Sequence, residues 1–125
     1  MNDGDAKANL PRAECLITFI PESEGGRSFP PHLSGDVYRP HLVIGDPTQR
    51  HAVLAEGNRL TEEYLGIAFH QGPANASIGA EMKALLTLMY YPRLSYEELK
   101  PGITFTIREG PRIVAFGSVL RLLNL

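Results

Sequence analysis

Residues 103–123 read ITFTIREGPRIVAFGSVLRLL, and they carry the clearest structural signal in the chain. The first half alternates Ile-Phe-Ile with threonine and arginine, which is the period of a half-buried strand. Residues 113–123 continue as a long apolar strand. A type II′ turn needs a positive φ at its first central residue and a φ near that of proline at its second. The stretch therefore predicts a hairpin that turns at Gly110 and Pro111.

Three further segments are short, apolar and bounded by turn residues. Residues 13–20, 38–44 and 64–70 have this character, which is typical of strands. Pro40 lies inside the second segment, and proline has no N–H to donate to a central ladder. We therefore expect Pro40 near the start of its strand or at a sheet edge.

Residues 81–91 form the longest apolar block, and their pattern alone permits either a helix or a strand. Apolar residues occupy every second position, yet the polar pair Lys83 and Thr87 also has helical spacing. We favour a strand because Pro92 follows and the neighbouring segments are strands. Ser95 and Glu98 have the spacing of a capping box, so one helical turn is expected over residues 96–100. Residues 49–63 follow no clear pattern.

Length and composition indicate one folded domain built from short elements. The chain has 125 residues, of which 43% are hydrophobic and 21% charged, as in ordinary globular domains. Glycine and proline number 12 and 10 and are scattered along the chain, which favours many turns. We expect a flexible leader over residues 1–12 and a single all-β domain over residues 13–125, a small antiparallel barrel or sandwich.

Several classes of function find no support in the residues. The net charge is −2, so no global basic field attracts nucleic acid or anionic lipid. No glycine is followed by lysine, which excludes the usual nucleotide-binding loop. The four histidines lack the spacing of a metal site, and the single cysteine lies in an apolar strand. We expect no catalytic centre, no metal, no cofactor, no membrane segment and a cytoplasmic location.

The remaining candidates are charged turns whose glycine or proline residues fix the backbone. They are the sequences EGGR at 24–27, YRP at 38–40 and REGPR at 108–112. Arginine forks bind carboxylates and phosphates, and a short turn reduces the entropy lost on binding. The simpler interpretation is that these three turns are solvent-exposed hairpin ends with no binding role. The predicted partner-binding residues are Arg27, Tyr38, Arg39, Arg108, Glu109 and Arg112.

These three motifs, in this order and spacing, resemble the C-terminal (third) domain of bacterial elongation factor Tu over about residues 13–125. The family carries E-G-G-R after its first strand, Y-R-P before its second, and F-x-I-R-E-G-x-R near its end. The resemblance implies a small antiparallel Greek-key β-barrel. Three positions depart from the family pattern, Ser28, His41 and Pro111, and residues 45–79 are longer than their counterpart.

The resemblance also implies partners from translation: aminoacyl-tRNA, the factor's GTPase domain and its nucleotide-exchange partner. The family binds tRNA with three domains, so tRNA binding by this domain is expected to be weak. We therefore expect a non-enzymatic stand-alone module that recognises a protein partner of the translation machinery. The alternatives are a tRNA- or RNA-binding module, or a mimic of elongation factor Tu that competes for its partners.

Overall fold

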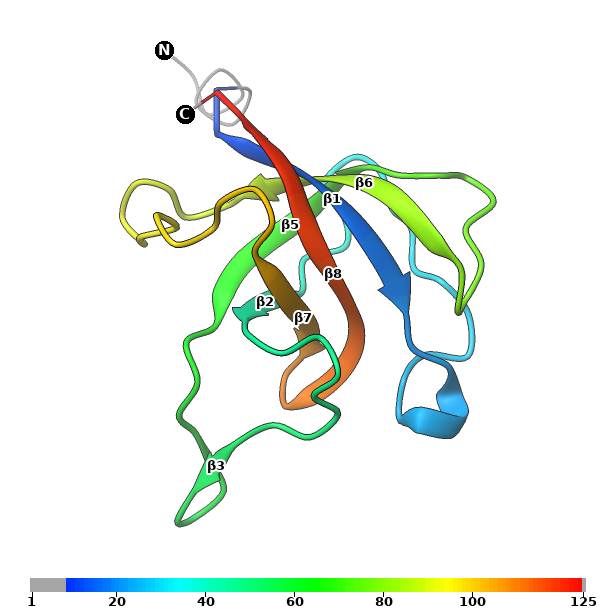
Figure 1. The fold of residues 1–125 in the computed structure, drawn as a ribbon, viewed down its shortest axis with the longest axis vertical. Helices are drawn as coiled ribbons and strands as arrows, with labels where there is room; N and C mark the ends of the chain where they lie inside the picture. Colours follow the sequence, from blue (N-terminus) through cyan, green and yellow to red (C-terminus); the bar gives the residue numbers. More distant parts are fainter. Residues whose placement is uncertain (1–8, 125) are drawn as a thin grey trace.

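A computed structural model describes residues 9–124, and in it six antiparallel strands close into a barrel (Figure 1). Two long connections, from the first barrel strand to the second and from the fourth to the fifth, make neighbours of strands that are not consecutive, which is a Greek-key arrangement. The predicted all-β barrel is therefore confirmed. In barrel order the strands are β1 (Arg12–Phe19), β6 (Glu81–Leu88), β5 (Leu65–Gln71), β2 (His41–Ile44), β7 (Thr104–Glu109) and β8 (Arg112–Leu123).

The barrel begins slightly before the expected start of the domain. Most of the expected leader, residues 1–8, lies outside the described residues. Pro11 is buried, and its carbonyl accepts a hydrogen bond from the Leu88 N–H at 3.0 Å. Because β1 begins at Arg12, the last residues of the expected leader belong to the barrel wall.

The ambiguous block over residues 81–91 is a strand, as favoured. β6 pairs with β1 through seven residues and with β5 on its other side, so the neighbouring strands supply the ladder that selects strand over helix. It ends at Leu88, three residues earlier than expected. The neighbouring strands, which were one reason to favour a strand here, thus decide between the two structures that the pattern alone permits.

The helical turn expected over residues 96–100 does not form. Ser95 Oγ accepts from the Glu97 N–H at 3.4 Å, and a simple turn is closed by the Leu99 N–H and the Tyr96 carbonyl at 2.9 Å. Tyr96 is buried, and its hydroxyl donates to the Gly66 carbonyl at 2.7 Å. Burial of the Tyr96 ring fixes the path of the loop, so no helix begins at Ser95 despite the capping-box spacing.

The final hairpin has the predicted geometry. Glu109 and Arg112 are paired across a two-residue connection, and Gly110 has a φ of 61°. The strict alternation expected in β7 is wrong, because Thr106 and Arg108 are also buried. Residues from the segment before β5 cover this outer face, so β7 is enclosed on both sides.

Residues 45–64 leave the barrel and carry a small separate hairpin. It consists of β3 (Leu54–Ala55) and β4 (Arg59–Leu60) and projects from one end of the barrel (Figure 1). Its turn contains Gly57 and Asn58, both with positive φ. This segment includes residues 49–63, in which the sequence showed no clear pattern.

Aromatic rings fill the end of the barrel nearest the predicted turns. The rings of Phe19, Tyr38 and Phe69 lie 5.4–6.5 Å apart, which is the range of favourable aromatic pairs. They continue the apolar core that all six barrel strands share. This packing holds Tyr38 in place shortly before β2, although Tyr38 belongs to no strand.

Between residues 9 and 124 no helix is long and apolar enough to cross a bilayer.

Candidate functional site

The structure gathers four of the six predicted residues around one carboxylate. Glu109 Oε2 accepts a hydrogen bond from Arg27 Nη1 at 2.6 Å and another from the Tyr38 hydroxyl at 2.6 Å. Arg112 Nη2 donates to the Gly26 carbonyl at 3.1 Å, next to Arg27. We call Arg27, Tyr38, Glu109 and Arg112 the Glu109 cluster. All three sequence motifs therefore contribute to one surface.

Two aromatic rings flank the Arg27 guanidinium. Its central carbon lies 5.5 Å from the centroid of Tyr38 and 5.6 Å from that of Phe29, within the range of cation–π contacts. Arg27 Nε also donates to the Phe29 carbonyl at 3.2 Å. Phe29 itself is 65% exposed. The cluster thus presents an apolar ring next to a fixed cation.

The turn that carries Arg27 depends on two glycines for different reasons. The short 3-10 helix η1 (Glu22–Glu24) ends at Gly25, which has a φ of 91°, a left-handed conformation that glycine adopts without strain. Gly26 needs space instead, because a Cβ there would lie 1.9 Å from the Ile20 carbonyl oxygen. The two glycines hold the chain against β1 and direct Arg27 toward Glu109.

The contacts shift the ionisation of the cluster in consistent directions. Burial, and secondly the hydrogen bond to Glu109, raise the pKa of Tyr38, so the phenol stays a donor. Burial opposes ionisation of Glu109, but the hydrogen bonds from Tyr38 and Arg27 outweigh it and lower the pKa of that carboxyl. Glu109 is therefore ionised near neutral pH and offsets the charge of Arg27. Arg112 is left as the exposed cation of the cluster.

Arg108 belongs to a different, enclosed site on the other face of β7. Its side chain is fully buried, and Nη1 and Nη2 donate to the two oxygens of Glu62 at 2.6 and 3.0 Å. Tyr64 and Thr106 accept further hydrogen bonds. The hydrogen bond from Arg108 lowers the pKa of Glu62 to about 2. An arginine enclosed in this way fastens residues 45–64 to the barrel and presents nothing to solvent.

Arg39 also lies apart from the Glu109 cluster. Its Nε donates to the Asp36 carbonyl at 2.8 Å, and the side chain borders a small pocket of about 130 Å³ together with Thr87 and Met89. No contact with the cluster is found in the described part of the chain. The predicted set therefore divides into the four cluster residues, the enclosed Arg108 and the exposed Arg39.

A groove of about 360 Å³ adjoins the cluster on the side of the projecting segment. Arg112, Arg50 and Leu54 are among the residues that line it. Arg50 sits 5.0 Å from the centroid of the Phe116 ring, and its Nε is 3.8 Å from a Glu24 oxygen. The groove extends the cluster toward β3 with apolar and basic side chains and one acidic side chain, Glu24.

Cys15 lies buried in β1, as expected for a thiol in an apolar strand. Burial, and secondly the charge of Glu14, raise its pKa to about 12, so the reactive thiolate does not form near neutral pH. Within residues 9–124, no group of three metal-ligating side chains is found.

No protein-family model matches the chain. Comparison with curated proteins gives no match either. Reasoning from the sequence missed Glu62 and Arg50, which lie in the segment without a clear pattern, and Tyr64, which directly precedes β5. The sequence did contain a signal that Arg108 lies apart from Glu109. The two residues are adjacent in a predicted strand, and side chains of adjacent strand residues point to opposite faces.

Proposed function

We propose that this protein is a non-enzymatic binding module of the type found as the C-terminal domain of elongation factor Tu. The Glu109 cluster and the exposed Phe29 would recognise a protein partner of the translation machinery. The carrying observation is that Glu109 joins the three turn motifs on one surface, through its ion pair with Arg27 and the hydrogen bond that it accepts from Tyr38. A cytoplasmic location, where the free thiol of Cys15 stays reduced, agrees with this proposal.

The arrangement suits a protein partner because its groups are held in place before binding. Arg27 is fixed by one carboxylate, one backbone carbonyl and two rings, so little side-chain entropy is lost when a partner docks. Aromatic and arginine side chains are also the residues that most often dominate protein interfaces. Phe29 and Arg112 are the exposed members and are therefore the expected contact residues.

The same contacts argue against RNA as the main partner. Glu109 offsets Arg27, and Glu62 offsets Arg108, so two of the four predicted arginines are unavailable to neutralise phosphates. Each phosphate contact contributes roughly 0.7 to 0.9 to the slope of log affinity against log salt. We expect any tRNA binding to be weak and to show the slope of about two contacts at most.

The proposal is tested by direct binding to purified proteins that the resemblance names. The probes are the GTPase domain of elongation factor Tu and the nucleotide-exchange factor, measured by biolayer interferometry, with deacylated tRNA as the alternative ligand. Phe29→Ala and Arg112→Ala should each weaken protein binding about tenfold. The matched controls are Leu120→Ala and Arg93→Ala, which remove an exposed apolar and an exposed basic side chain on other parts of the surface.

Two outcomes would overturn the proposal. One is the absence of binding to both proteins at micromolar concentration. The other is binding that the cluster variants and the control variants weaken equally. Strong tRNA binding with a steep dependence on salt would instead favour the RNA-binding alternative.

A further inference from the structure

The barrel wall has an opening between β2 and β5, beside the end of β2. All four residues of β2 pair with β7, but only His41 and Leu42 have partners in β5. The segment before β5 is held elsewhere, because Glu62 and Tyr64 bind Arg108. Val43 and Ile44 therefore have no strand opposite them on this side within the described residues.

The backbone of Ile44 faces the opening. The Gly45 N–H donates to the Thr104 carbonyl of the connection into β7 at 3.0 Å. In an antiparallel ladder, consecutive residues direct their N–H and C=O groups to opposite sides. Since Gly45 bonds toward β7, the polar groups of Ile44 point away from β7 and toward the gap. An unpaired strand edge of this kind can accept an added strand.

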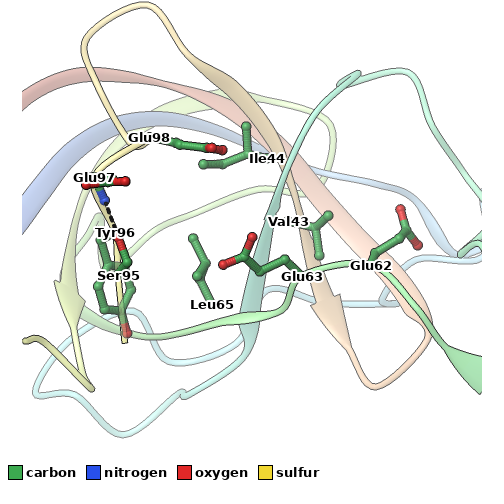
Figure 2. Close-up of a pocket in the computed structure, with 9 residues that line it drawn as sticks. All are labelled: Val43, Ile44, Glu62, Glu63, Leu65, Ser95, Tyr96, Glu97 and Glu98. Atoms are coloured by element: carbon green, nitrogen blue, oxygen red, sulfur yellow. Dashed lines mark hydrogen bonds between the residues drawn. The ribbon is translucent and has the colours of Figure 1, made fainter. Parts of the chain in front are cut away.

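The opening contains a pocket of about 420 Å³. The apolar part of its lining, which we call the floor, consists of Val43, Ile44 and Leu65. Figure 2 shows Glu63 and Glu98 reaching toward this floor from opposite sides, whereas Glu62 points away to Arg108. The side chains of Glu63 and Glu98 make no ion pair with any residue between 9 and 124. Glu97 adds a third exposed carboxylate at the rim.

We infer that this pocket binds an extended, lysine- or arginine-bearing segment of a protein partner. The segment adds to the free edge of β2 through Ile44, and its basic side chain lies between Glu63 and Glu98. The aliphatic stem of lysine or arginine packs on an apolar floor while its charged end reaches the carboxylates. The carboxylates thus select a segment with a basic side chain, and the free edge of β2 sets the direction in which the backbone of that segment runs.

This surface is distinct from the Glu109 cluster. The pocket adjoins Ile44, opposite Phe105 of β7, whereas the cluster adjoins Glu109 at the other end of that strand. The inference therefore does not rest on the proposed function, and either can fail alone.

The probe is a capped pentapeptide, Thr-Val-Lys-Val-Thr, titrated at low salt into the full-length 15N-labelled protein. We expect amide shifts at Ile44, Glu63, Leu65 and Glu98. A second peptide carries norleucine in place of lysine and should bind about fivefold more weakly, as the loss of exposed charge pairs predicts. Two further peptides test strand addition. One is N-methylated at the amides that would face Ile44, and the other at the alternate amides, which would face away. A methylated amide cannot donate a hydrogen bond to β2, so only the first peptide should lose binding.

Protein variants complete the test. Glu63→Gln with Glu98→Gln should weaken binding of the lysine peptide about fivefold and leave the norleucine peptide unaffected. Glu22→Gln with Glu81→Gln removes the same charge from exposed positions away from the pocket and is the control. The inference is overturned if millimolar lysine peptide causes no shifts around Ile44. It is equally overturned if norleucine binds as well as lysine, or if both methylated peptides bind alike.

Discussion

Arg108 and Glu62 are joined by two hydrogen bonds, Nη1 to Oε1 at 2.6 Å and Nη2 to Oε2 at 3.0 Å, although 46 positions separate them in the chain. Arg108 is fully buried, and the side chain of Glu62 is 16% exposed. The guanidinium is also 5.4 Å from the centroid of the Tyr64 ring. This pair attaches the projecting segment to the barrel and opens the gap beside β2.

Glu62→Ala is expected to reduce the free energy of unfolding by about 3 kcal/mol, because it leaves the buried Arg108 cation without a counter-charge. Urea denaturation followed by circular dichroism measures the change. Glu63→Ala is the matched control, since its exposed carboxylate makes no ion pair in the described residues, and it should change stability by less than about 0.5 kcal/mol. Equal effects of the two substitutions would contradict the role assigned to the pair.

Acid should destabilise the protein in a defined pH range. The pKa of Glu62 is lowered from its usual 4.5 to about 2, and the pKa of Glu109 is also lowered. A lowered folded-state pKa stabilises the protein above the unfolded value, and that stability is lost as the pH falls. Glu62 alone should account for about 3 kcal/mol between pH 4.5 and pH 2.

The measurement is urea unfolding at a series of pH values from neutral to acid. Glu62→Gln should be less stable at neutral pH and should show a flatter decline below pH 4.5. A variant curve parallel to that of the unchanged protein would assign the acid sensitivity to other groups.

Gly26→Ala should be more damaging than Gly25→Ala, although the residues are adjacent. A Cβ at Gly26 would meet the Ile20 carbonyl oxygen at 1.9 Å, whereas nothing lies within 4 Å at Gly25. We expect a loss of about 3 kcal/mol at Gly26 from the forced backbone shift. The loss at Gly25, from its positive φ alone, should be about 1 kcal/mol. Thermal unfolding of the two variants side by side provides the comparison, and the reverse order would show that the close approach to β1 is unimportant.

A double-mutant cycle should detect the ion pair at the centre of the Glu109 cluster. Arg27 and Glu109 are 23% and 28% exposed in their side chains and 2.6 Å apart. Alanine at each position and at both should give a coupling energy of about 1 kcal/mol. The control cycle is Arg121 with Glu14, a 3.2 Å pair whose arginine is 63% exposed. Its coupling should stay below about 0.5 kcal/mol, and a coupling as large as that of the cluster would refute the distinction.

Much of the barrel could be predicted from local patterns. The hairpin at Gly110 and the strand start after Pro40 follow from spacing and backbone preference. The strand over residues 81–88 does not, because its pattern also permits a helix and pairing with β1 and β5 decides the outcome. The helical turn over residues 96–100 was wrong because burial of Tyr96, a tertiary contact, overrode a local signal. Residues 49–63 were unpredictable because none of them is buried, so no periodic apolar face marks their path.

The amino-acid order determined where strands begin and turn, because steric limits and side-chain alternation act between near neighbours. It also specified three turns rich in arginine and glutamate. Only the closed barrel decided that Arg27 shares a surface with Glu109 while Arg108 is enclosed with Glu62. Those partners lie 82 and 46 residues apart, and charges so distant along the chain meet only when the packed core brings their strands together.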